Sequence, residues 1–75
     1  MALSEYIIRY DAYADVLYVK IREGKVVESD EVENGIILDY DINGNIIGIE
    51  ILDFSKRKID LNELVVKGPR VLVKT

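Results

Sequence analysis

The fold is decided by residues 35–53, GIILDYDINGNIIGIEILD, in which two runs of aliphatic residues flank the pair Asn43-Gly44. An Asn-Gly pair between such runs is typical of a β-hairpin, because both residues tolerate the positive φ angles of tight turns. Side chains alternate between the faces of a strand, so a loop of even length is needed to keep the apolar side chains together. The stretch therefore predicts a hairpin with one apolar face.

Two loops satisfy this parity and both remain open. One is a two-residue turn at Asn43-Gly44, and the other is a four-residue loop over 41–44 with Gly44 in the left-handed conformation. A three-residue loop is rejected because it would oppose Leu38 with Gly48 and mix the faces. The even loops form the apolar pairs Ile36/Ile51, Leu38/Ile49 and Tyr40/Ile47. The opposite face then holds Ile37, Asp39, Asp41, Ile46, Gly48 and Glu50.

Three further strands are predicted before the hairpin, over residues 5–10, 16–22 and 25–32. The second alternates cleanly between apolar and polar residues, whereas the third is poor in apolar residues and suits a solvated strand. Because the connections between these strands are short, we expect consecutive strands to pair in chain order as an antiparallel meander.

The pattern after the hairpin is helical. Ser55 is expected to cap a turn through residue 58, and Asp60 followed by Glu63 matches the start of a helix that ends at Gly68-Pro69. The stripe expected to pack on the sheet is Leu61, Leu64 and Val65. Residues 70–74 are apolar enough for a sixth strand. The predicted fold class is α+β, a five-stranded antiparallel β-meander with a short C-terminal helix and this sixth strand.

Composition predicts one small domain over residues 1–75. The chain is 49% hydrophobic and 32% charged, which is typical of a folded protein and not of a disordered one. No apolar run approaches the roughly 20 residues of a membrane span, and residues 1–5 lack the basic start of a secretory signal, so we expect a cytoplasmic protein without a membrane partner. With no cysteine and no histidine, neither a disulfide nor a typical zinc site can stabilise the small core, and we expect a homo-oligomer.

The charge is distributed unevenly along the chain. Residues 1–53 carry four basic and twelve acidic side chains, whereas residues 54–75 carry six basic and two acidic ones. This polarity suits head-to-tail self-association or a basic protein partner. Because the net charge is −4, nucleic acid is not an expected partner, although Lys56-Arg57-Lys58 could contact phosphate.

Several motifs resemble those of the domain-of-unknown-function 2283 family. They are Tyr10-Asp11, Ala14-Asp15, Leu17-Tyr18-Val19, residues 35–41 (GIILDYD), residues 48–53 (GIEILD) and Ser55-Lys56-Arg57. The resemblance spans roughly residues 6–58, with Phe54 standing where a small residue is expected. It implies a prokaryotic protein without an assigned activity. Some relatives are regarded as antitoxin-like, which implies a small RNase-like toxin as partner.

No set of residues predicts catalysis. The chain has no Cys or His nucleophile or base, and Ser55-Lys56 are adjacent residues whose side chains are expected to point apart. Asp39, Asp41 and Glu50 could hold Mg²⁺ or Ca²⁺ if they converged, but their spacing differs from the calcium-loop pattern, so caps and solvated carboxylates are favoured. We expect no enzyme activity, no cofactor and no metal.

The expected function is a non-catalytic protein-interaction module. Its alternative is a self-assembling structural homo-oligomer, followed by a carboxylate-based metal-dependent enzyme. Tyrosines join apolar area to a polar tip and acidic strips attract basic partners. The candidate interaction surface consists of Glu28, Asp30, Glu31, Asp39, Asp41, Glu50, Tyr13 and Tyr18. The competing interpretation of residues 28–31 is that their charges discourage unwanted sheet pairing.

Overall fold

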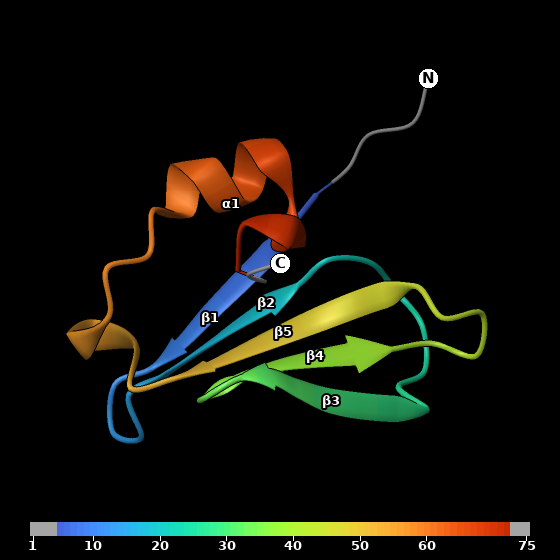
Figure 1. Ribbon diagram of the computed structural model, residues 1–75, viewed down its shortest axis with the longest axis horizontal. Helices are drawn as coiled ribbons and strands as arrows, with labels where there is room; N and C mark the ends of the chain where they lie inside the picture. The colour runs from blue at the N-terminus through green and yellow to red at the C-terminus, as the bar shows by residue number, and fades with distance from the viewer. Residues whose placement is uncertain (1–4, 73–75) are drawn as a thin grey trace.

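The computed structural model describes residues 5–72 and contains one antiparallel sheet with an α-helix above it (Figure 1). The strands are β1 (Ile7–Asp11), β2 (Val16–Lys20), β3 (Glu28–Glu33), β4 (Ile36–Tyr40) and β5 (Ile46–Leu52). The helical segments are the 3-10 helix η1 (Phe54–Lys56), the α-helix α1 (Leu61–Lys67) and the 3-10 helix η2 (Pro69–Leu72). The strand order is β1-β2-β5-β4-β3. The α+β class with five antiparallel strands and a C-terminal helix is confirmed.

One pairing differs from the chain order expected of a consecutive meander, because β2 pairs with β5 and not with β3. The predicted strands left only residues 23–24 between them, whereas β2 ends at Lys20 and β3 begins at Glu28. Residues 21–27 can extend about 20 Å. That length exceeds the three inter-strand spacings of about 4.8 Å that separate β2 from β3. The connection can therefore pass the ends of β5 and β4 before β3 starts.

Backbone hydrogen bonds attach this connection to the strands that it passes. Ile21 N donates to Ile47 O of β5 at 2.9 Å, and Val27 N donates to Tyr40 O of β4 at 2.9 Å. The strand order thus follows from where β2 stops and from the backbone groups available at that end of the sheet.

The hairpin loop has three residues, so the rejection of a three-residue loop on grounds of parity was wrong. Asp41 N donates to Asn45 O at 3.0 Å and Gly44 N donates to Asp41 O at 3.0 Å, which leaves residues 42–44 as the loop. Gly44 has a φ of 80°, in the left-handed conformation that three-residue hairpin loops require at this position.

A bulge restores the apolar face beyond the loop. The pairs Ile36/Ile51 and Leu38/Ile49 are confirmed, but the register shifts between Asp39 and Tyr40, so that Tyr40 opposes Ile46 and not Ile47. Ile46 consequently packs against the core. Ile47 is only 2% exposed, and its side chain is the nearest neighbour of Gly24 in the 21–27 connection.

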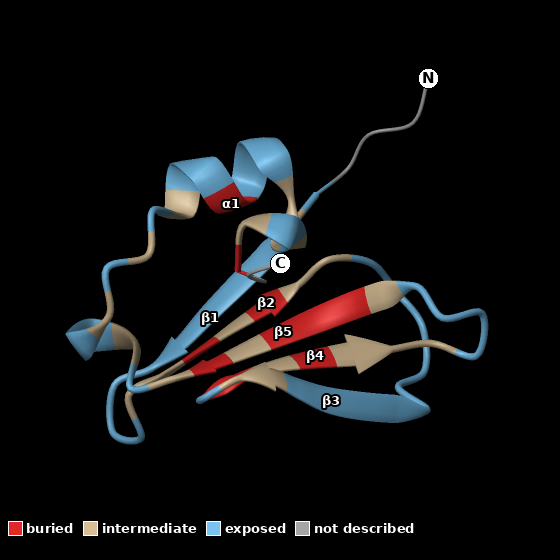
Figure 2. Cartoon of the chain, viewed as in Figure 1, coloured by how far each residue is buried: buried red, intermediate tan, exposed pale blue. Residues whose placement is uncertain are grey.

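The core lies between the sheet and the C-terminal segments (Figure 2). It comprises Leu17, Val19, Ile36, Leu38, Ile49, Ile51, Leu64 and Leu72. Because Leu64 belongs to α1 and Leu72 to η2, these two segments cover one face of the sheet. No helix of the described residues covers the opposite face, which we call the open face.

The predicted helix start is confirmed: the Asp60 carboxylate accepts hydrogen bonds from Asn62 N at 2.9 Å and Glu63 N at 3.2 Å. Leu64 is fully buried, but Val65 is 50% exposed and does not belong to the packing stripe. The sixth strand was wrong over residues 70–72, which lie in η2, and residues 73–74 of it fall outside the described residues. None of the helices within residues 5–72 is long and apolar enough to span a membrane.

Candidate functional site

The open face brings together candidate residues from four strands. The register sets Tyr18 of β2 opposite Glu50 of β5, Glu50 opposite Ile37 of β4, and Ile37 opposite Glu31 of β3. Asp39 lies in the next row on the same face, opposite Gly48. The central position of β5 places Glu50 between the tyrosine and the acidic edge of the sheet.

Tyr18 lies over a glycine on this face. A Cβ atom added to Gly48 would be 2.5 Å from the Tyr18 hydroxyl oxygen and 3.1 Å from its Cζ atom. The same Cβ would be 3.1 Å from Oδ2 of Asp39, whose Oδ1 accepts a hydrogen bond from Ser29 Oγ at 2.6 Å. The absence of a side chain at Gly48 thus lets the ring of Tyr18 lie flat beside the acidic residues.

The edge strand β3 carries four carboxylates in the sequence ESDEVE. Glu28 and Asp30 pair with Tyr40 and Leu38, so they lie on the side of the core, whereas Glu31 lies on the open face. Glu31 also accepts a hydrogen bond from Gly35 N at 2.9 Å. Among the described residues the ion pairs are Lys20–Glu23 and Lys67–Glu63, and neither involves β3. We call Glu28, Asp30, Glu31, Asp39 and Glu50 the acidic band.

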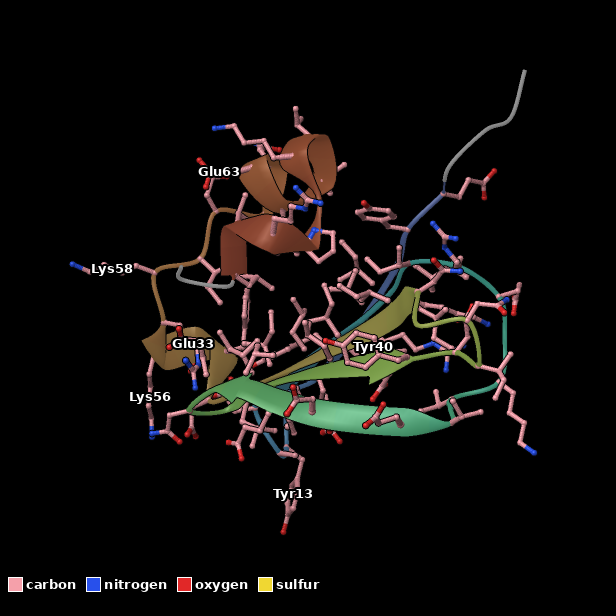
Figure 3. All side chains as sticks on the ribbon, turned by 45° about the vertical axis from the view of Figure 1, so that its right-hand side comes forward. Tyr13, Glu33, Tyr40, Lys56, Lys58 and Glu63 are labelled. Atoms are coloured by element: carbon pink, nitrogen blue, oxygen red, sulfur yellow. The ribbon has the colours of Figure 1, made fainter. Side chains whose placement is uncertain are left out.

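Two candidate residues lie outside this surface. Asp41 directly precedes the 42–44 loop, and its carboxylate accepts hydrogen bonds from Asn43 N and Asn45 N, both at 2.9 Å. These bonds lower the pKa of Asp41, the one from Asn45 most. Tyr13 is fully exposed in the β1–β2 turn at the other end of the sheet and points away from it (Figure 3). Asp41 and Tyr13 therefore do not form one surface with the acidic band.

Asp15 organises the end of the sheet where β1, β2 and β5 meet η1. Its carboxylate accepts hydrogen bonds from the Tyr10 hydroxyl at 2.6 Å, from Ser55 N at 2.9 Å and from Ser55 Oγ at 2.7 Å. Its carbonyl accepts from Phe54 N at 3.0 Å, and the Tyr10 and Phe54 rings meet edge to face at 6.0 Å. We call Tyr10, Asp15 and Ser55 the Asp15 latch, because it ties the first turn to the segment after β5.

The latch changes the acidity of its members. The hydrogen bond from Tyr10 and those from Ser55 lower the pKa of Asp15. The same bond to Asp15, together with desolvation and the nearby carboxylates, raises the pKa of the Tyr10 hydroxyl. Ser55 was expected to cap η1, but its hydroxyl is used by Asp15 and the cap residue is Asp53, which makes no side-chain cap bond. The latch is a structural network in which the side chains of Tyr10, Asp15 and Ser55 are hydrogen-bonded to one another.

A family model described as "Protein of unknown function (DUF2283)" matches residues 7–55. The chain belongs to the DUF2283 family. The match begins at β1 and ends at Ser55, so the region shared with the DUF2283 family contains the whole sheet, the acidic band and the Asp15 latch, and stops before α1. Searches among curated proteins and among solved structures give no significant match.

Arg57 lies just beyond the DUF2283 match and holds two turns together. Its Nε donates to Leu52 O at 2.6 Å and its Nη2 donates to Asn34 O at 2.7 Å. A Cβ atom at Gly35 would collide with Nη2, and Gly35 has a φ of 81°, so only glycine fits beneath this guanidinium. Arg57 is therefore occupied by backbone carbonyls, while Lys56 and Lys58 on either side are exposed.

The carboxylates do not assemble into a metal-ligand set within residues 5–72, where no group of three or more Asp or Glu side chains could hold a metal ion. Asp39, Asp41 and Glu50 in particular do not converge. Two of the three are engaged separately, Asp39 by Ser29 and Asp41 by its own loop.

Sequence reasoning missed the Asp15 latch and the Arg57 contacts. A signal for the latch was present, because Tyr10, Asp15 and Ser55 all occur in the motifs that resemble the family. Their convergence, however, depends on the pairing of β2 with β5, which the expected strand order did not contain.

Proposed function

We propose that this DUF2283 protein is a non-catalytic interaction module that presents its acidic band to a basic protein. One observation carries the proposal: β3 is a free edge strand with four carboxylates and no ion pair to any described cation. Glu28 and Asp30 project from this edge on the side of the core, whereas Glu31, Asp39 and Glu50 carry the acidic band onto the open face, where Tyr18 borders it.

The band is suited to steering and orienting a partner. Exposed ion pairs contribute only about 0.2–1 kcal/mol each, so several such pairs produce a weak and salt-sensitive association by themselves. Complementary charge mainly accelerates association, whereas apolar and aromatic contacts supply residence time. The half-buried side chains of Tyr18 and Ile37 supply such contacts beside Glu50.

The partner is proposed to be a protein and not nucleic acid, because a polyanion would be repelled by the band. A basic, toxin-like protein, the partner class of the antitoxin-like relatives, is one form that such a partner takes. Of the cluster Lys56-Arg57-Lys58 after β5, Arg57 is held by backbone carbonyls, which leaves two exposed lysines against the five carboxylates of the band.

The test compares two variants with equal change of charge. Asp30→Asn/Glu50→Gln neutralises one carboxylate of the band on each side of the sheet, and Glu5→Gln/Glu63→Gln neutralises two exposed carboxylates elsewhere. Each chain is immobilised and incubated with lysate of the native host at low salt, and bound proteins are identified by mass spectrometry. We expect a basic protein that the wild type and the control retain, that the band variant loses, and that raising the salt to about 0.3 M releases.

Equal recovery by the band variant and the control would contradict the proposal. Recovery of the same protein at about 1 M salt would also contradict it, because surface charge pairs are screened within about 3 Å at that concentration. Glu31 is left unchanged in the test because its bond to Gly35 N supports the β3–β4 turn.

A further inference from the structure

Within residues 5–72 the strand β1 forms the second free edge of the sheet, and it differs chemically from the β3 edge. All five of its residues are exposed (Figure 2). Three are large hydrophobic side chains: Ile7 is 45% exposed, Ile8 42% and Tyr10 47%. A free edge presents unpaired N–H and C=O groups that can accept a further strand, and proteins commonly guard such edges with charge.

The two edges differ in that protection. The residues of β3 include four carboxylates and no cation, so two β3 strands repel each other. The residues of β1 include one arginine, Arg9, and one aspartate, Asp11, so β1 carries no net charge and does not repel a copy of itself. The charge pattern therefore selects β1, and not β3, as the edge for a second copy of this chain.

We propose that β1 pairs antiparallel with β1 of a second copy, forming a continuous ten-stranded sheet about a twofold axis at Ile8. A twofold axis perpendicular to the sheet keeps both helix-covered faces on the same side. Residues that oppose each other must then belong to the same face, which allows the axis to pass through Ile8 or through Arg9 but not between them.

The chemistry of the opposing residues favours the axis at Ile8. That register sets Ile8 against Ile8, Ile7 against Arg9 and Tyr6 against Tyr10. An axis at Arg9 would set two guanidinium groups directly opposite each other, which is unfavourable. Tyr6 already packs against the hydrophobic core, so pairing at Ile8 extends the core across the twofold axis.

Pairing through β1 leaves β3 free at the two outer edges of the joined sheet. The proposed dimer does not depend on the proposed binding of a basic protein. Substitutions in β1 test the dimer, whereas substitutions in the acidic band test the binding of the partner. If both hold, each dimer presents two acidic bands, which raises the apparent affinity for a partner with two binding sites.

The first test uses sedimentation equilibrium of the full chain with two matched variants. Ile8→Lys places two lysines opposite each other at the axis, whereas Val66→Lys makes the same change at a residue of α1 that is 81% exposed. We expect the wild type and Val66→Lys to sediment as dimers at about 100 µM. Ile8→Lys is expected to raise the dissociation constant roughly a hundredfold, since it opposes like charges in a desolvated contact.

The second test determines the register with two charges at one position. Ile7→Glu places a carboxylate opposite Arg9 of the second copy and is expected to tighten the dimer several-fold, whereas Ile7→Lys is expected to weaken it by a similar factor. The opposite ranking, with Ile7→Lys the tighter, would show the axis at Arg9, where Ile7 faces Asp11, and would overturn the proposed register.

Circular dichroism of each variant establishes that the chain is folded before its mass is compared. A wild type that remains monomeric up to about 1 mM, the concentration scale of the weakest specific associations, overturns the dimer. A dimer that Ile8→Lys leaves as tight as the wild type overturns the choice of β1.

Discussion

Gly48 offers a sharp test of the open face, because its missing side chain makes room for Tyr18. We consider Gly48→Ala in the wild type and in a Tyr18→Ala background. The added Cβ would lie 2.5 Å from the tyrosine hydroxyl oxygen and 3.1 Å from Cζ, whereas ordinary contacts are about 3.5–4.0 Å. The ring must therefore move by about 1 Å, and the Asp39 carboxylate at 3.1 Å limits the room for that movement.

The expected magnitudes follow from two opposing effects. Overfilling a packed site costs about 1–3 kcal/mol, so Gly48→Ala should destabilise the wild type by that amount. Without the ring, the same change only replaces a flexible glycine in a strand and should stabilise the protein by about 0.5–1 kcal/mol. The coupling energy between Gly48 and Tyr18 should therefore be about 1.5–4 kcal/mol.

The assay is urea unfolding of the four chains followed by far-UV circular dichroism, with free energies compared at equal slopes. Gly44→Ala is the control, because Gly44 has a left-handed φ of 80° in the adjoining hairpin loop but no atom lies within 4 Å of the position that an added Cβ would take. Its cost should be the same with and without Tyr18. A cost of Gly48→Ala that agrees in the two backgrounds within about 0.5 kcal/mol would refute the packing argument.

Three further predictions concern the latch, the turns and the helix. The lowered pKa of Asp15 adds stability above about pH 4 that is lost on acidification, and the raised pKa of Tyr10 adds stability below about pH 10 that is lost on alkalinisation. The melting temperature should therefore fall both at acid pH and at alkaline pH. Asp15→Asn should reduce both changes, and asparagine tolerates the left-handed φ of 56° at this position. Arg57→Met should lower the free energy of unfolding in urea by about 1–3 kcal/mol, because two carbonyls lose a charged donor. Leu64→Ala, at a fully buried position, should cost about 2–5 kcal/mol, whereas Val66→Ala should change little.

Much of the sheet could be predicted because local patterns determine it. The position of the turn at Asn43-Gly44 and the Asp60 helix cap are set by neighbours within a few residues, and this turn aligns the apolar pairs Ile36/Ile51 and Leu38/Ile49; each is confirmed. The loop length was not predictable from parity alone, since a bulge after Asp39 compensates for an odd loop. A periodicity argument assumes an unbroken ladder, and a bulge violates that assumption without any apolar residue being lost from the core.

The candidate site was predicted only in part, because its assembly depends on contacts between distant segments. Of the candidate residues, the strand register places Glu31, Asp39, Glu50 and Tyr18 on one face of the sheet. Tyr13 was assigned to that surface from its residue type alone, which carries no information about the end of the sheet on which it lies. The expected sixth strand failed for a similar reason, since a short apolar run at the end of a chain suits a core-packing 3-10 helix equally well.

The observed strand order explains why the two edges of the sheet are so different. In a consecutive meander the last strand, β5, would form an edge. That strand is the most apolar of the five, with the sequence IIGIEIL, and an exposed edge of this kind favours aggregation. Placing β5 in the centre buries Ile49 and Ile51 and moves the acidic β3 to the edge that β5 would otherwise form, while the neutral β1 keeps the other edge. The acidic edge is the one proposed to bind a basic partner, and the neutral edge is the one proposed to pair with a second copy of the chain. The length of the 21–27 connection permits this order, and the sequences of β1 and β3 then give the two edges their different charge.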